Sequence, residues 1–175
     1  MPNIIRPELV LPQLDLKPGM FIADFGSGAG DFALFFAKRI LPEGRVYAID
    51  VQSSAIESVK SRAKLESIFN IEPLLRNLEA PGGSKLPDDF VDLVFIANIL
   101  FQAPDKAVIL KEARRILKPG GKVMIIEWKP EAAGLGPPKN FRIFPETISA
   151  LAKNEGLSPA KEFDFITHYG IEFIK

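Results

Sequence analysis

Short apolar runs alternate with segments of helical periodicity along nearly the whole chain. The runs at 21–25, 45–50 and 91–97 are rich in residues that favour strands. Between the first two runs, apolar residues recur at helical spacing from Phe32 to Ile40 and mark one buried helix face. Because strands and helices that alternate in this way require right-handed crossovers, we expect a parallel sheet covered by helices on both faces.

The second half of the chain continues this alternation. The further elements expected are a helix opened by a capping box at 54–57, a strand at 71–75, a helix with Pro104 in its first turn, a strand at 122–128 and a helix from Pro145 to Gly156. Two final strand-like runs, 160–166 and 169–174, are separated only by Thr167 and His168, too few residues for a crossover. We therefore expect an α/β, Rossmann-like, seven-stranded and mostly parallel sheet that ends in an antiparallel C-terminal hairpin, with His168 exposed in the hairpin turn.

Length and composition limit the organisation further. The 175 residues suffice for one substantial core, so we expect a single domain, 1–175, that includes a short N-terminal segment at 1–16. The 22 basic and 22 acidic residues cancel, which gives no strong signal for a nucleic-acid partner. The chain has no cysteine, and we expect no metal site. Because it shows neither a secretory signal nor an apolar run that could span a membrane, a cytoplasmic protein is expected, with its oligomeric state left open.

The most informative segment is 24–31, Asp-Phe-Gly-Ser-Gly-Ala-Gly-Asp, between the first strand and the first helix. Open α/β sheets bind ligands at this edge, and glycines let the backbone approach a ligand closely. The spacing is G-x-G-x-G, whereas dinucleotide-binding turns have G-x-G-x-x-G. A carboxylate at Asp24 would repel a pyrophosphate but can accept hydrogen bonds from an ammonium group. The segment therefore favours the amino-acid end of S-adenosylmethionine, with a tight turn that binds nothing as the alternative.

A second carboxylate ends the neighbouring strand. Asp50 lies 20 residues after Gly30, which places it at the carboxyl end of the second strand. From that position a carboxylate can accept hydrogen bonds from both hydroxyls of a ribose. The alternative is an exposed Asp in a turn.

Four segments in order, 24–30, 46–50, 92–95 and 117–123, resemble the motifs of class I S-adenosylmethionine-dependent methyltransferases. The closest likeness is to the small-molecule branch typified by ubiquinone/menaquinone-biosynthesis methyltransferases, and it runs from about Lys17 to the C-terminus. It implies S-adenosylmethionine as cofactor, S-adenosylhomocysteine as product and an unidentified small-molecule acceptor. The cofactor-binding residues that it implies are Asp24, Gly26, Ser27, Gly28, Gly30, Asp50, Val51, Asn77, Leu78, Ala97 and Asn98.

The resemblance also implies roles for these residues. The three glycines would pass beneath the methionine moiety, Asn98 would lie beside the methyl group, and the backbone of Ala97 near the ammonium group. The segment 77–79 would flank the adenine, where the family usually has an Asp at the position of Asn77. The amide oxygen of Asn77 can still accept a hydrogen bond, without the gain from charge, and Glu79 could substitute for it. Alternatively, Asn77 caps a turn.

The acceptor side is less defined. Candidate residues are Gln102, Glu127, Trp128 and Arg142, and no catalytic residue is identified. The loop at 129–142, rich in Gly and Pro, is either a substrate lid or a plain connector. The short N-terminal segment suggests an open site or one that a partner completes.

Other functions stay open or are disfavoured. A protein or RNA methyltransferase with an open site and a catalytically silent S-adenosylmethionine-binding subunit both remain possible. A nicotinamide-binding oxidoreductase or sensor is disfavoured by the glycine spacing and by the terminal hairpin. Methylation of nucleobase amino groups is disfavoured because residues 97–100 lack the Asn-Pro-Pro-aromatic motif, and arsenite methylation because it needs thiolates.

Overall fold

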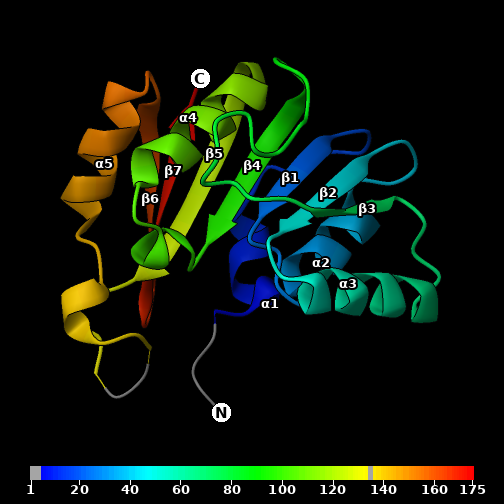
Figure 1. Ribbon diagram of the computed structural model, residues 1–175, viewed down its shortest axis with the longest axis horizontal. Coiled ribbons are helices and arrows are strands. Elements are labelled where there is room, and N and C mark those ends of the chain that lie inside the picture. Colours follow the sequence, from blue (N-terminus) through cyan, green and yellow to red (C-terminus); the bar gives the residue numbers. More distant parts are fainter. Residues whose placement is uncertain (1–4, 134–135) are drawn as a thin grey trace.

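Seven strands form one sheet in the computed structural model, which describes residues 5–133 and 136–175. The strands are β1 (Phe21–Phe25), β2 (Arg45–Asp50), β3 (Ile71–Leu75), β4 (Val91–Ala97), β5 (Leu117–Trp128), β6 (Ser158–Phe165) and β7 (His168–Ile174). Their order in the sheet is β3-β2-β1-β4-β5-β7-β6 (Figure 1). The first five strands pair in parallel, and β7 pairs antiparallel with both β5 and β6. The expected mostly parallel sheet with an antiparallel C-terminal hairpin is confirmed.

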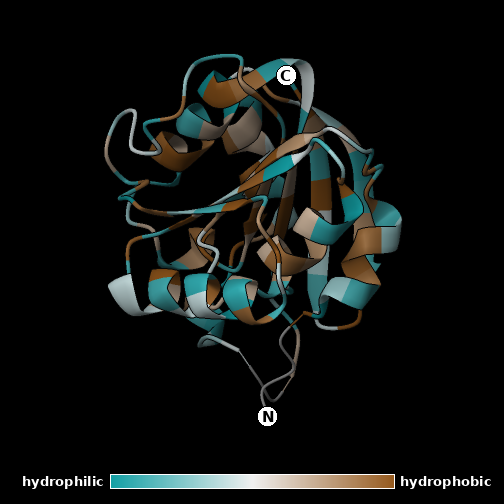
Figure 2. Ribbon diagram, turned by 90° about the vertical axis from the view of Figure 1, so that its right-hand side faces the viewer, coloured by the Kyte–Doolittle hydropathy of each residue, from teal (hydrophilic) through white to brown (hydrophobic). Residues whose placement is uncertain are grey.

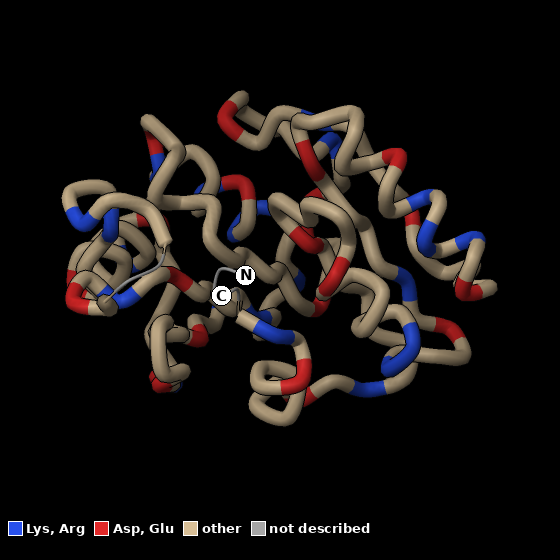
Figure 3. Tube along the Cα trace, turned by 90° about the horizontal axis from the view of Figure 1, so that it is seen from below, with Lys and Arg blue, Asp and Glu red and all other residues tan. Residues whose placement is uncertain are grey.

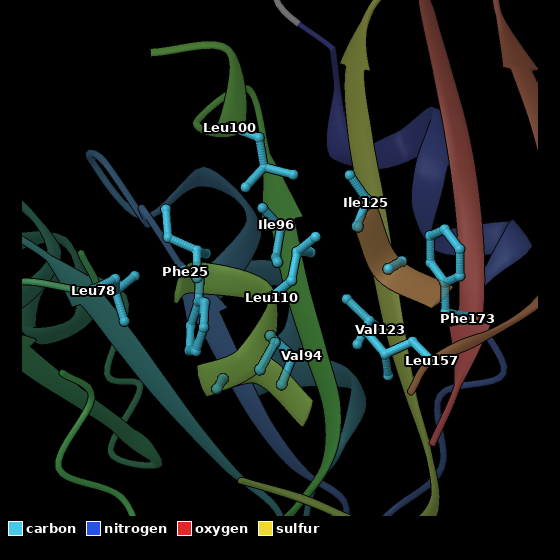
Figure 4. Close-up of a cluster of buried hydrophobic side chains, with 14 of the residues drawn as sticks. Phe25, Leu78, Val94, Ile96, Leu100, Leu110, Val123, Ile125, Leu157 and Phe173 are labelled. Atoms are coloured by element: carbon cyan, nitrogen blue, oxygen red, sulfur yellow. The ribbon is translucent and has the colours of Figure 1, made fainter. Parts of the chain in front are cut away.

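Helices cover the two faces of this sheet. They are α1 (Pro7–Val10), α2 (Asp31–Arg39), α3 (Ser53–Leu65), α4 (Lys106–Ile116) and α5 (Pro145–Asn154), with 3-10 turns η1 (Leu11–Gln13), η2 (Leu100–Gln102) and η3 (Lys139–Phe141). Residues of α4 and α5 pack on one face of the strands, in the cluster drawn in Figure 4. Residues of α1, α2 and α3 pack on the other face. In Figure 2 the helices carry both hydropathy colours, as expected for elements with one buried side.

The N-terminal segment is part of the core. Four of its apolar side chains, Ile5, Val10, Leu11 and Leu14, are buried with residues of α2 and of the sheet. Pro7 stands at the first position of α1, where its missing N–H costs nothing. This segment therefore packs, together with α2, on the sheet face to which β4 and β5 contribute buried side chains.

Two helix starts differ from the expectation. The capping box expected at 54–57 is wrong: α3 begins at Ser53, and its N-cap, Gln52, makes no side-chain capping bond. Pro104 precedes α4, because the side chain of Asp105 accepts a hydrogen bond from the Ala107 N–H and caps the helix there. Capping by a carboxylate outweighed the preference of proline for the first turn.

Strand boundaries also moved, because pairing with neighbours extends two strands. The strand expected at 122–128 begins at Leu117, which pairs with Val91 across an irregularity in the register. His168 belongs to β7, where it pairs with Trp128 and Phe165, and its side chain is fully buried. The expectation that His168 is an exposed turn residue is wrong; the turn is one residue earlier, at Ile166 and Thr167.

The topology creates a switch point between β1 and β4. From β1 the chain runs outward to β2 and β3, and then returns to β4 on the other side of β1. Ligands of open α/β sheets bind beside the carboxyl ends of strands at such a point. Figure 3 views the molecule from this edge, and basic and acidic positions are mixed across it. No helix in the described ranges is long and apolar enough to cross a membrane.

Candidate cofactor and acceptor site

The glycine-rich loop joins β1 to α2 at the switch point. Gly26, Gly28 and Gly30 all have positive φ angles, of 71°, 52° and 88°. At Gly26 a side chain is excluded for a second reason, because a Cβ there would lie 2.3 Å from Cγ2 of Ile99. A Cβ at Gly28 would meet nothing within 4 Å, so this part of the loop faces open space. The loop is therefore covered by Ile99 at its start and free to contact a ligand at its middle.

Asp50 ties the glycine loop to the start of α3. Its Oδ2 accepts a hydrogen bond from the Gly28 N–H at 2.9 Å, and its Oδ1 accepts one from the Gln52 N–H at 2.9 Å. The side chain also lines a cavity beside the loop. A carboxylate held by two backbone N–H groups is fixed in orientation and keeps lone pairs for further donors, such as ribose hydroxyls.

Three buried polar atoms near the ends of β1 and β4 have no hydrogen-bond partner among the described residues: Oδ2 of Asp24, Oγ of Ser27 and Oδ1 of Asn98. Burial, with a contribution from the nearby Asp50 carboxylate, raises the pKa of Asp24 to about 7. Buried polar groups are normally paired, so unpaired ones mark places where a ligand or water completes the structure. Acceptors and a hydroxyl in this group suit the amino-acid end of S-adenosylmethionine.

A cavity of about 200 Å³ opens next to Asp50. Its walls are formed by Gly26, Asp50, Val51, Gln52, Arg76, Asn77, Leu78, Glu79, Ile99, Gln102, Ala103 and Ile109. This volume is below that of pockets that enclose a whole drug-sized ligand. We propose that it holds one part of the cofactor, the nucleoside, and we call it the nucleoside cavity. The cavity brings together five of the predicted cofactor residues: Gly26, Asp50, Val51, Asn77 and Leu78.

Asn77 does cap a turn at this wall. Its Oδ1 accepts a hydrogen bond from the Glu79 N–H at 2.9 Å. An amide oxygen has two lone pairs, so one stays available toward the cavity. Both readings of Asn77 from the sequence, turn cap and adenine contact, are compatible with this geometry.

The segment after β4 forms the opposite wall. Asn98 has φ of 58°, which turns the chain sharply from β4 into η2. Its backbone N–H donates to the Ile126 carbonyl at 2.9 Å, and its own carbonyl accepts from the Gln102 side chain at 3.3 Å. The turn places Ile99 over Gly26 and lets Gln102 face the cavity. Predicted residue Gln102 therefore borders the nucleoside cavity, and Ala97 and Asn98 lie just before it.

Glu127 lies under the same segment. Its side chain is 1% exposed, Oε1 accepts a hydrogen bond from the Leu100 N–H at 2.8 Å, and Oε2 has no partner among the described residues. Burial raises the pKa of Glu127 to about 7, against the opposing effect of the backbone N–H groups of Leu100 and its neighbours. Glu127 contacts η2 instead of opening to solvent.

Trp128 and Arg142 lie together beside the loop 129–142. The Arg142 guanidinium stands 5.8 Å from the Trp128 ring and donates to the carbonyls of Lys129, Ala132 and Pro137. His168 stacks on the other side of this cluster, 4.1 Å from the Trp128 ring, and burial lowers its pKa to about 4. Arg142 therefore connects three parts of the loop through their carbonyls. Gly134 and Leu135 of the loop lie outside the described residues.

A second hollow lies between this loop and η2. A groove of about 540 Å³ is lined by Phe101, Gln102, Ala103, Pro104, Lys106, Pro137, Pro138 and Phe141. Gln102 and Ala103 also line the nucleoside cavity, so these two residues border both spaces. The lining is mainly apolar.

Several of these residues were not singled out from the sequence. Arg76, Ile99 and Ala103 line the nucleoside cavity, and Phe101 and Phe141 line the groove. The only signal for them was their position just after a predicted strand or within the predicted lid. Within 5–133 and 136–175, no group of three or more His, Cys, Asp or Glu residues could hold a metal ion.

Comparison with known proteins identifies the family. Residues 16–156 match the family model described as a methyltransferase domain. The chain belongs to this methyltransferase family. A ubiquinone/menaquinone biosynthesis C-methyltransferase of Cupriavidus metallidurans is 34% identical over 124 residues, which cover 69% of this chain and 49% of that protein. The corresponding enzyme of Hydrogenovibrio crunogenus is 32% identical over 145 residues, which cover 80% and 56%. This methyltransferase therefore matches about half the length of these curated relatives.

Solved structures agree with the family. An S-adenosylmethionine-dependent methyltransferase from Aquifex aeolicus superposes with a TM-score of 0.88 at 28% identity, and the match covers 98% of this chain and 90% of that one. The expected family and cofactor are confirmed: the chain belongs to the S-adenosylmethionine-dependent methyltransferases, whose normal product is S-adenosylhomocysteine.

Proposed function

We propose that this methyltransferase transfers the methyl group of S-adenosylmethionine to a small organic acceptor with an apolar ring, of quinone-like or phenolic type. The observation that carries the proposal is the apolar groove that shares its lining residues Gln102 and Ala103 with the nucleoside cavity. The relatives named above act in ubiquinone and menaquinone biosynthesis, as their names state, which agrees with such an acceptor.

The cofactor has a matching set of residues. Asp50 would accept the ribose hydroxyls, and Asn77 and Leu78 would border the adenine. Asp24 and Ser27 would bind the polar end of the methionine moiety, with the glycine backbone beneath it and Ala97 and Asn98 beside it. When bound, S-adenosylmethionine supplies an electrophilic methyl group on a sulfonium. The residues of this site would bind and align the two molecules and exclude water, which is the main requirement of an in-line displacement.

The loop 129–142 would act as the cover of the groove. Pro137, Pro138 and Phe141 line the groove on one side, and η2 lines it on the other. Arg142 fastens the loop through backbone carbonyls, so its contribution would be to shape the groove. The Trp128 ring would support the loop, because Gly136 packs directly against it.

Two alternatives from the sequence receive less support. A protein or RNA acceptor would need a patch of one charge beside the site, whereas Lys106 is the one charged residue among the described residues that line the groove. A silent cofactor-binding subunit would have no use for an acceptor groove that shares lining residues with the cofactor cavity.

The test is S-adenosylhomocysteine release with a panel of phenols and quinols, a basic peptide and an RNA, followed by two matched variants. Phe141 lines the groove, whereas Phe144, 60% exposed, lies outside it. Once an acceptor has been identified, we expect Phe141→Asp to raise its KM about tenfold. This is the effect expected from the loss of an apolar contact that contributes about 1.4 kcal/mol to binding. Phe144→Asp should leave the KM unchanged. Turnover of the peptide or RNA alone, or equal effects of both variants, would reject the proposal.

A further inference from the structure

The carboxylate of Glu127 is buried near the end of β5, and it accepts a hydrogen bond from a different element. Oε1 accepts the N–H of Leu100, the first residue of η2, at 2.8 Å. The backbone N–H groups of Phe101 and Ile99 also stabilise the charged form of this carboxylate and so oppose the rise of its pKa. Since the first N–H groups of a helical turn have no partner within it, a carboxylate under η2 satisfies donors that would otherwise be buried and unpaired.

The anchored segment forms part of the nucleoside cavity. Ile99 precedes Leu100 and lies against Gly26, and Gln102 and Ala103 follow it in the cavity wall. The backbone immediately before is in the left-handed region at Asn98, so the chain path depends on contacts that hold it there. Besides the backbone bond from Asn98 to Ile126, the bond from the Leu100 N–H to Glu127 ties this path to β5, and it is made by a side chain.

We propose that Glu127 is a positioning residue for the cofactor: by accepting the Leu100 N–H it sets the wall of the nucleoside cavity formed by Ile99, Gln102 and Ala103. The proposal rests on the assignment of that cavity to the nucleoside made above. It gives Glu127 a role toward the cofactor that the sequence did not suggest, because the sequence placed this residue on the acceptor side.

Other charged and titratable groups near Glu127 do not replace this contact. The Lys106 ammonium lies on the α4 side, but it donates to the Ala103 carbonyl at 2.9 Å. Tyr169 faces Glu127 from β7, and its hydroxyl donates to the Ile143 carbonyl at 2.9 Å. Both groups are engaged with other elements, so the anchor of η2 is the carboxylate itself.

The experiment is calorimetric titration of S-adenosylhomocysteine into purified protein at pH 8, above the pKa of about 7 of this carboxyl. Glu127→Met keeps the volume without an acceptor, and Glu127→Asp keeps the charge but is one methylene too short. We expect both to weaken Kd about tenfold, as for a lost hydrogen bond to a charged group. Glu127→Gln keeps an acceptor oxygen at the same reach, and its Kd should stay within about threefold.

Glu172→Met is the matched control. Glu172 is also a buried glutamate, 2% exposed on the adjacent strand β7, but it pairs with Lys122 far from the cavity. This variant should lose thermal stability and keep the Kd of the parent. If Glu127→Met does not fold, the comparison of the Kd values of Glu127→Asp and Glu127→Gln tests the proposal.

Three results would overturn the proposal. The first is a parental Kd for Glu127→Met or Glu127→Asp. The second is equal loss in Glu127→Gln, which would mean that acceptance of the Leu100 N–H is not the role. The third concerns the cavity itself: if Asp50→Ala also binds like the parent, the cavity does not hold the nucleoside, and the proposed cofactor site fails with it. Loss of binding in Asp50→Ala but not in the Glu127 variants would reject the Glu127 role alone.

Discussion

Buried polar atoms without partners gather where β1 and β4 end, at Asp24, Ser27 and Asn98. Each costs stability in the free protein, because a buried polar group loses its water and gains no replacement. Natural proteins keep such groups at functional sites, where hydrogen bonds to a bound ligand offset this loss of stability. The residues that make the site useful are therefore expected to make the free protein less stable.

The stability cost of one such buried group, the Asp24 carboxyl, can be measured. Its pKa is about 7 in the folded protein against 3.8 ordinarily, so between these values the folded state holds a proton that the unfolded state has lost. Its contribution to stability is therefore present below pH 4 and is lost as pH rises to 7. Asp24→Asn removes this loss, so the variant should gain stability relative to the parent between pH 4 and pH 8, by a few kcal/mol at most.

The measurement is urea unfolding of both proteins without ligand at several pH values. Comparing the variant with the parent cancels Glu127 and His168, whose pKa values are also shifted, in opposite directions. The same variant should bind S-adenosylmethionine more weakly, because an amide replaces a carboxylate acceptor. A stability difference that does not change with pH would contradict the raised pKa.

Gly26 gives a second prediction at the residue scale. Gly26→Ala meets two obstacles, the positive φ of 71° and the contact with Ile99 at 2.3 Å. We expect a loss of about 2 kcal/mol or more in the free energy of unfolding and a large loss of cofactor affinity. Adding Ile99→Ala removes the second obstacle only, so it should restore part of the stability. No restoration in the double variant, measured by thermal unfolding, would show that backbone strain alone limits this position.

At the scale of elements, the site is built where three connections meet: the glycine loop after β1, η2 after β4, and the loop 129–142 after β5. In each connection one side chain holds the backbone through hydrogen bonds. Asp50 ties the glycine loop to α3, Glu127 ties η2 to β5, and Arg142 ties its loop to itself. Loops positioned by such contacts present functional groups with little freedom.

Arg142→Lys tests the last of these ties. A guanidinium can donate to several carbonyls at once in a fixed planar geometry, which an ammonium cannot reproduce. The loop 129–142 should open more often, and limited proteolysis should cut it about tenfold faster than in the parent. Lys38→Arg, on the surface of α2, serves as the control. Unchanged cleavage of the loop would mean that its packing on Trp128 suffices to hold it.

For the whole molecule, the three-layer arrangement places every predicted cofactor residue on one edge of the sheet. Ligand binding at this edge should stabilise the entire domain, because the residues come from β1, β2, β4 and the segments that follow β1, β2, β3 and β4. S-adenosylmethionine at 100 times its Kd adds about 2.7 kcal/mol. For a chain of 175 residues this corresponds to a rise of roughly 5–10 °C in Tm. NAD at equal concentration should give no shift; a larger shift with NAD would mean that the glycine loop binds a dinucleotide.

Local patterns in the sequence were sufficient for the sheet, its parallel order and the cofactor edge. Alternating apolar periods force crossovers, and strand ends that carry Asp24, Asp50 and Ala97 must then meet at one edge. The groove proposed for the acceptor could not be predicted in this way, because its walls come from η2 and from residues 137–141, which have no periodicity and meet only in the folded chain. The burial of His168 and the contact of Glu127 with Leu100 likewise depend on which strand pairs with β5, and pairing between distant segments is decided by tertiary packing.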